Sequence, residues 1–230
     1  MPLPDFTSPA VFPAFANLPL GSNIPPPPSK TSNDPPPYAP GDAPDASAPP
    51  TYTPVPATTT HFLLAEVKQN MTITKPTLIA TDRAGADFAI TFEDRGIDLR
   101  PVKSGWTVVV PGATRTSPAE GKRGFVRVGE GRGTGVHYLP AGLERVLDLG
   151  RQLGEAARGG EAAVCAGCEK EETEGDALMR CTGCGRARYC SKGSFGDLAP
   201  LGLGLKKDWG EGGHKVDCKV FKAMAVTWGA

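Results

Sequence analysis

Six cysteines and one histidine in the last third of the chain have the types and the spacing of metal ligands. A Cys-x2-Cys pair lets two thiolates reach one tetrahedral ion from a short turn, and two such pairs occur here with twelve residues between them. A histidine and a cysteine four positions apart share one helix face and can supply two further ligands. The sequence therefore predicts zinc binding, with these candidate ligands: Cys165, Cys168, Cys181, Cys184, Cys190, His214 and Cys218.

The order of these ligands resembles the MYND-type zinc finger. The resemblance covers residues 165–218 and includes "RYCSK" around Cys190, "KKDW" ending at Trp209 and "HKVDC" from His214. It implies two zinc ions held in interleaved fashion. Transferred to this chain, it implies one complete site, Cys181, Cys184, His214 and Cys218, and a second that lacks a fourth ligand, Cys165, Cys168 and Cys190.

The chain departs from the family pattern at residues 193–205. The resemblance calls here for a short segment with one more cysteine between Cys190 and Trp209. This chain has "GSFGDLAPLGLGL" instead, which contains neither cysteine nor histidine. Water or Asp197 would have to fill the open position of the second site. We therefore expect one tightly bound Zn²⁺ and a second site that is weak or empty.

Three thiolates with an open position could also belong to a catalytic zinc, because zinc enzymes use three protein ligands and a water. The nearest precedent with cysteine ligands, a deaminase, needs a His-x-Glu and a proline before its Cys-x2-Cys. Val164 and Arg180 precede the two pairs here, and the chain has no His-x-Glu. The sequence predicts a structural site and no enzyme.

Charge and composition bear on the compartment and the partners. The formal net charge is zero, which argues against a nucleic-acid partner. No apolar run is long enough for a membrane span, and the start "MPLPDF" lacks the regions of a secretory signal. We expect an intracellular protein, in the nucleus or the cytoplasm. Thiols stay reduced there, which favours metal over a disulfide framework.

Residues 1–60 contain 18 of the 24 prolines, one lysine, no arginine and no cysteine. This composition predicts a disordered proline-rich arm, because it offers too little apolar surface to offset the entropy of ordering. Two copies of Pro-Pro-x-Tyr within it resemble WW-domain ligands, which dock as preformed polyproline helices. The candidate partner-binding residues are Pro35, Pro36, Tyr38, Pro49, Pro50 and Tyr52. A plain linker is the alternative.

Residues 61–158 read as a small β-rich domain with a C-terminal helix. Alternating apolar residues predict strands at 62–67, 106–110, 124–128 and 136–139, and a hairpin over 77–92 that reverses at "DRAG". Apolar residues at helical spacing predict a helix over 141–158, with Pro140 just before it. Counted as five strands and a helix, this pattern predicts an OB-like barrel.

The predicted fold is therefore mixed: a disordered arm, an OB-like domain, a small α-rich zinc-binding module over 165–218, and a tail over 219–230. The predicted function is a non-catalytic zinc-binding adaptor. The resemblance implies that the finger recognises short proline-containing peptides. The alternative is a nucleic-acid-associated transcriptional regulator that uses the OB-like domain. Its stacking residues would be Phe62, Trp106, Phe125 and Tyr138, and its cations Arg115, Lys122, Arg123 and Arg127, although the aromatic residues serve equally well as core.

Overall fold

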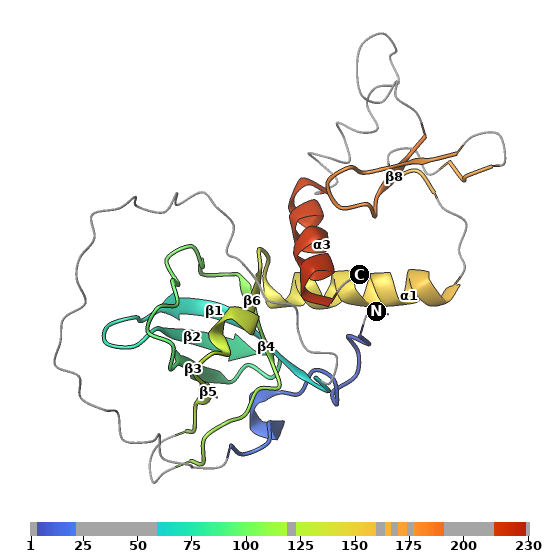
Figure 1. Ribbon diagram of the computed structural model, residues 1–230. Helices are drawn as coiled ribbons and strands as arrows, with labels where there is room; N and C mark the ends of the chain where they lie inside the picture. The colour runs from blue at the N-terminus through green and yellow to red at the C-terminus, as the bar shows by residue number, and fades with distance from the viewer. Residues whose placement is uncertain are drawn as a thin grey trace, which may run out of the picture.

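The computed structural model is built on one curled sheet of six strands that wraps part of the way round a first core, like half a barrel (Figure 1). It describes residues 4–21, 59–118, 123–159, 164–166, 170–173, 177–190 and 214–228. The strands of the sheet are β1 (Phe62–Asn70), β2 (Thr77–Asp82), β3 (Asp87–Phe92), β4 (Thr107–Pro111), β5 (Val126–Val128) and β6 (His137–Leu139). The other elements are the 3-10 turns η1 (Phe15–Asn17) and η2 (Gly133–Gly135), helix α1 (Leu143–Gly159), the short strands β7 (Met179–Arg180) and β8 (Arg188–Tyr189), and helix α3 (His214–Trp228).

The strand order is β5-β3-β2-β1-β4-β6, and only the β3–β5 pair is parallel. The hairpin predicted over 77–92 is confirmed as β2 and β3. Its turn is fixed by the Asp82 carboxylate, which accepts the backbone N–H of Ala84 and Ala86, and by Gly85 at φ +77°. All six segments predicted as strands form, although they were counted as five. The described sheet has β5 and β6 at its two ends, so it is an open half-barrel.

Strands β1 and β4 are buried on both faces, which explains their continuous apolar runs "FLLA" and "VVV". Leu63, Ala65 and Val108 point into the first core, inside the curl of the sheet. The residues between them point to a second core on the outer face, where Phe62, Leu64 and Val109 meet the helices. One sheet thus separates two hydrophobic cores.

The first residues of the chain are not a disordered arm. Residues 4–21 pack on both cores and contribute Phe6 and Phe12 to the second, and Phe15 and Leu18 to the first, each less than 9% exposed. The composition of residues 1–60 hid this, because three phenylalanines within ten positions provide enough apolar surface to order their own segment. Residues 1–3 and 22–58 of the predicted arm lie outside the described residues.

Helix α1 forms as predicted and covers the outer face of the sheet. The carboxylate of Glu66, on β1, accepts the backbone N–H of Leu143 at 3.2 Å, which supplies a partner for an otherwise unpaired N–H group of the first turn. Leu143, Val146 and Leu149 then enter the second core at helical spacing. The helix is therefore fixed to the sheet both by its end and by its apolar side.

The prediction of a tail over 219–230 was wrong, because helix α3 continues to Trp228. Val220, Met224 and Trp228 recur every four residues and are all buried in the second core. A helix face that repeats in this way can be buried as a stripe. Figure 1 shows α3 rising from α1 towards the β7–β8 hairpin, so this helix joins the sheet domain to the hairpin.

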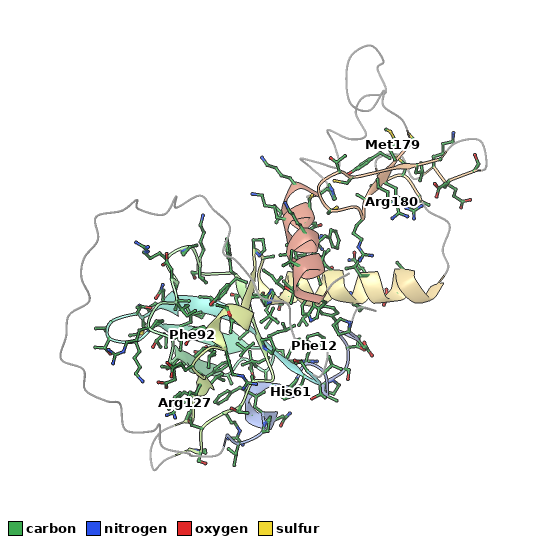
Figure 2. All side chains as sticks on the ribbon, in the orientation of Figure 1. Phe12, His61, Phe92, Arg127, Met179 and Arg180 are labelled. Carbon is green, nitrogen blue, oxygen red and sulfur yellow. The ribbon has the colours of Figure 1, made fainter. Side chains whose placement is uncertain are left out.

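The hairpin of β7 and β8 has a small third core of its own, in which Leu178 and Tyr189 surround Cys165. Met179 and Arg180 on β7 lie well away from Phe92 inside the sheet (Figure 2). Within its described residues, the module predicted as α-rich consists of a β-hairpin and the first turns of α3. No described helix is both long and apolar enough to cross a membrane.

Candidate metal centre

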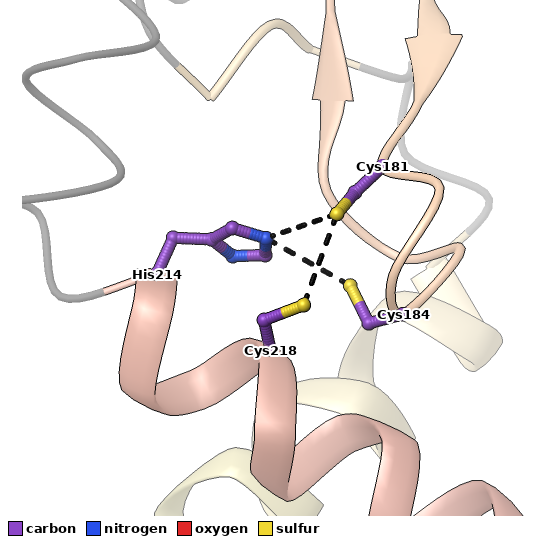
Figure 3. Close-up of side chains that lie close together, drawn as sticks. All are labelled: Cys181, Cys184, His214 and Cys218. Carbon is purple, nitrogen blue, oxygen red and sulfur yellow. Dashed lines mark hydrogen bonds between the residues drawn. The ribbon is translucent and has the colours of Figure 1, made fainter.

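Two elements bring four of the predicted ligands together. Cys181 and Cys184 lie on the turn that leaves β7, and His214 and Cys218 lie one turn apart at the start of α3 (Figure 3). The turn is held by backbone hydrogen bonds from Gly185 to Cys181 and from Cys181 to Ala187, both 2.8 Å. The Tyr189 ring stands edge-on to the His214 imidazole, with 6.2 Å between ring centroids.

The distances among the four ligands fit a tetrahedral zinc ion. Zinc–sulfur bonds of about 2.3 Å at tetrahedral angles place two sulfurs about 3.8 Å apart. The Sγ atoms of Cys181 and Cys218 are 3.8 Å apart. The Nε2 atom of His214 is 3.4 Å from Sγ of Cys181 and 3.8 Å from Sγ of Cys184. All four ligand atoms lie within 4.8 Å of one another, so one ion can contact all of them.

The thiols of this cluster have shifted pKa values in opposite directions. Burial alone would raise the pKa of Cys181, but hydrogen bonds from His214 and from the backbone of Cys184 and Gly183 outweigh it and lower that pKa to about 6. Burial, together with repulsion from Cys184 and Cys181, raises the pKa of Cys218 to about 12. A divalent cation among the ligands would relieve this repulsion, so metal binding and loss of the last proton are linked.

Helix α3 is fixed in place by an ion pair that the sequence did not reveal. Arg145 on α1 donates two hydrogen bonds to the carboxylate of Asp217, one of them from Nε to Oδ1 at 3.0 Å. Such two-point arginine–carboxylate pairs define geometry as well as charge. Asp217 directly precedes Cys218, so the pair sets the rotation of the helix that presents two ligands. The aspartate directly before the last ligand, in "HKVDC", was the one feature of the sequence that could have indicated this ion pair.

The remaining predicted ligands are only partly described, and the described ones, Cys165 and Cys190, belong to no four-ligand group. Cys165 is buried in the third core beside Leu178 and Tyr189, and Cys190 packs against the same core. Cys168 lies outside the described residues, as do Asp197 and Trp209. Within the described parts of the chain, the four-ligand cluster is the single group arranged to hold a metal ion.

Gly183, between the two cysteines of the turn, is the other residue that sequence reasoning missed. A Cβ atom added to it would lie 2.8 Å from Sγ of Cys218 and 3.7 Å from Sγ of Cys181. The turn can therefore approach the helix closely enough to share an ion only because this residue has no side chain. A glycine inside a Cys-x2-Cys turn is a signal that could have indicated it.

We predict that Gly183→Ala weakens zinc binding about 10- to 100-fold, because overpacking of this size costs about 1–3 kcal/mol. Competition with a chromogenic zinc chelator measures the change. Thr182→Ala is the matched control, since Thr182 is exposed in the same turn and should leave the affinity unchanged. Equal affinities for the two variants would show that the turn tolerates a side chain at this point.

Three of the four candidate stacking residues are not available as an open surface. Phe62 and Tyr138 are buried in the cores and Trp106 packs against the first core, so these three rings do not form an open stacking surface. The Pro-Pro-x-Tyr motifs around Tyr38 and Tyr52 lie outside the described residues.

Comparison of the chain with protein-family models, with curated proteins and with solved structures gave no match.

Proposed function

We propose that the chain is a non-catalytic, intracellular zinc-binding adaptor whose C-terminal module is a MYND-like finger. The observation that carries this proposal is the cluster of Cys181, Cys184, His214 and Cys218 at tetrahedral distances. These are also the four residues that the resemblance assigns to one complete site. In the proposed function the ion stabilises a binding surface and takes no part in a reaction.

The ligand set supports a structural role for the ion. Catalytic zinc sites keep one position open for water or substrate, whereas structural sites are closed by four protein ligands. Three cysteines and one histidine supply four ligands from this chain. A small hairpin such as β7–β8 has little core of its own, so metal binding would supply much of its folding free energy.

The partner that we propose for the finger is a short proline-containing peptide. The full chain, loaded with zinc, is to be titrated against a set of fluorescent proline-rich peptides, and again after treatment with EDTA. We expect binding by at least one peptide with zinc and loss of that binding without it. Binding that is unchanged by EDTA would place the peptide site elsewhere, and no binding by the folded, zinc-loaded chain would refute the adaptor function.

The Pro-Pro-x-Tyr motifs are proposed as a second protein-binding feature. We predict that Tyr38→Ala with Tyr52→Ala abolishes binding to a panel of WW domains, because the tyrosine is the anchor of that motif. The thermal melting of the protein should not change, and calorimetry checks both statements. If the wild-type chain binds no WW domain, these motifs belong to a plain linker.

A groove on the sheet favours the second candidate, a nucleic-acid-associated regulator. It has a volume of about 500 Å³ and runs along the outer side of β3 and β5. The Arg127 guanidinium lies over the Phe125 ring, 5.8 Å from its centroid, and Lys75 and Arg123 also line the groove. Phe125 is half-buried, and a cation beside an accessible aromatic ring suits single-stranded nucleic acid. Two acidic residues, Asp87 and Glu93, line it as well and reduce its positive charge.

This second candidate predicts binding that depends strongly on salt. An oligonucleotide of mixed sequence should bind the full chain at low ionic strength and be released as salt increases. Arg123→Ala with Arg127→Ala should remove the binding, whereas Cys181→Ser should act only through loss of folding. Absence of binding at low salt would leave the adaptor as the sole proposed function.

A further inference from the structure

Residues 4–21, here called the N-terminal segment, lie on the rest of the protein as a bound peptide would. Figure 1 shows the segment running from the helices, past the sheet, to the side of β5. Its anchors are aromatic side chains, and in Figure 2 Phe12 lies between the sheet and the helices. Residues 22–58 connect it to the start of the sheet domain.

The first half of the segment is held by an aromatic cluster. The Phe6 ring meets Trp228 edge-on at 5.2 Å between centroids, and the Phe12 ring meets Trp228 at 6.2 Å and Phe62 at 5.9 Å. Phe6 and Phe12 also stack on each other at 4.8 Å. Edge-on and offset ring contacts of this kind add about 0.5–1.5 kcal/mol each to the burial of the rings.

The Phe6 ring packs against α1 at a position where only glycine leaves enough space. A Cβ atom on Gly150 of α1 would lie 2.3 Å from the Phe6 ring, far inside contact distance. Glycine in the middle of a helix costs about 1 kcal/mol relative to alanine. The position is therefore unfavourable for the helix itself and favourable for the docking of Phe6.

The second half of the segment combines one more ring with backbone hydrogen bonds. Phe15 stacks on Phe88 at 4.4 Å with an interplanar angle of 8°. Three residues of the body form hydrogen bonds with the backbone of the segment. Phe62 N–H donates to Val11 O, and Phe15 N–H donates to Asp82 Oδ2. The backbone N–H of Arg115 donates to Pro19 O, and its carbonyl accepts from Gly21 N–H. These hydrogen bonds and ring contacts are made by residues of the segment itself and do not require its covalent connection to the sheet domain.

We propose that the surface formed by Phe62, Phe88, Arg115, Gly150 and Trp228, here called the docking surface, also binds the N-terminal segment of a second copy of this chain. The fit of that ligand is already present, since every contact of the segment with the body is noncovalent. The 37 residues from 22 to 58 can span on the order of 100 Å when extended. Their length therefore does not restrict the segment to its own chain.

Concentration decides which copy is bound. Tethering gives the chain's own segment an effective concentration on the order of 1 mM. At micromolar concentrations the wild-type chain is therefore a monomer with its own segment in place. Exchange between chains becomes dominant when the internal contact is blocked or when chains are concentrated at one place.

Two full-length variants test this without removing any part of the chain. In the acceptor, Phe6→Ala and Phe12→Ala leave the docking surface intact but remove the anchors of its own segment. In the donor, Gly150→Ala fills the space that the Phe6 ring occupies and is favourable for helix α1 itself. The docking surface of the donor is then blocked, while its N-terminal segment stays intact. Overpacking at Gly150 should weaken the internal contact up to about 100-fold. At about 100 µM acceptor, the effective concentration of about 1 mM favours the donor's own surface only about tenfold. An internal contact weakened about 100-fold therefore lets the donor segment bind the acceptor.

The expected result is a 1:1 heterodimer when acceptor and donor are mixed, seen by sedimentation velocity, with each variant monomeric alone. An acceptor that also carries Gly150→Ala is the control and should form no heterodimer with the donor. If acceptor and donor are both folded and loaded with zinc, and the mixture stays monomeric, the proposal is wrong.

A second experiment covers the case in which the acceptor does not fold. A protease site is inserted between residues 22 and 58 of the wild-type chain, and the folded protein is cut there. A labelled synthetic peptide of residues 4–21 should then replace the cleaved segment, and the same peptide with Phe12→Ala should not. Failure of the wild-type peptide to exchange over days would refute the docking surface as a site for a second copy.

Discussion

Replacing Cys181 with serine is expected to remove the bound zinc and to unfold the hairpin module together with the start of α3. Cys181 contributes a thiolate whose pKa is already lowered to about 6, and its Sγ lies within 3.8 Å of two other ligand atoms. Structural zinc sites supply on the order of 10 kcal/mol at neutral pH. Zinc per chain, measured by elemental analysis, should fall from near one to near zero.

The effect should reach beyond the module, because α3 also carries part of the second core. We expect the melting temperature of the whole chain to fall and the helical circular dichroism to decrease in the Cys181→Ser variant. Cys165→Ser is the comparison. It changes a buried cysteine that lies in the third core, outside the four-ligand cluster, and should keep one zinc per chain. Two zinc ions that both resist a mild chelator would show that Cys165 belongs to a second complete site.

Replacing Trp228 with alanine is expected to destabilise the protein by about 3–5 kcal/mol, the usual cost of removing a large aromatic side chain from a core. Trp228 is 6% exposed and meets Phe6, Phe12 and Phe62 at ring distances of 5.2–6.2 Å. For a chain of this length the melting temperature should fall by about 10 °C. Zinc affinity should also decrease, because the same helix positions His214 and Cys218.

Val226→Ala is the matched control for this prediction. Val226 lies on the same helix, two positions earlier, but is 50% exposed. Its replacement should change stability by less than about 0.5 kcal/mol, as for most surface substitutions. A similar loss in both variants would indicate that the end of α3 frays and does not contribute to the second core.

The metal centre could be predicted from the sequence because its determinants are local. A Cys-x2-Cys turn and a His-x3-Cys helix each bring two ligands together within a few residues, whatever the rest of the fold. What joins the two pairs is not local. Arg145, 72 positions before Asp217, fixes the helix and cannot be recognised from ligand spacing. Gly183 leaves the space for the helix, and only its place inside the Cys-x2-Cys turn could have indicated that role.

The strands of the sheet were also predictable, because alternation and turn residues are local patterns. The open sheet was not, since the positions of β5 and β6 at its edges depend on pairing over long separations. The N-terminal segment was missed because proline content was averaged over 60 residues. The end of α3 was not predicted from the metal ligands, which end at Cys218, although the repeat of Val220, Met224 and Trp228 is visible in the sequence.

The contact of Phe6 with Trp228 has a consequence for biosynthesis. Ribosomes add about 5–20 residues per second. The last strand of the sheet is therefore made about 4–18 seconds before Trp228, and Phe6 about 11–44 seconds before it. Throughout that interval Phe6, Phe12 and Phe62 lack the ring that covers them, and the apolar face of α1 has no partner helix. The nascent chain thus exposes an aromatic surface of the kind that chaperones bind, and its final fold and its metal site can form only after α3 has been made.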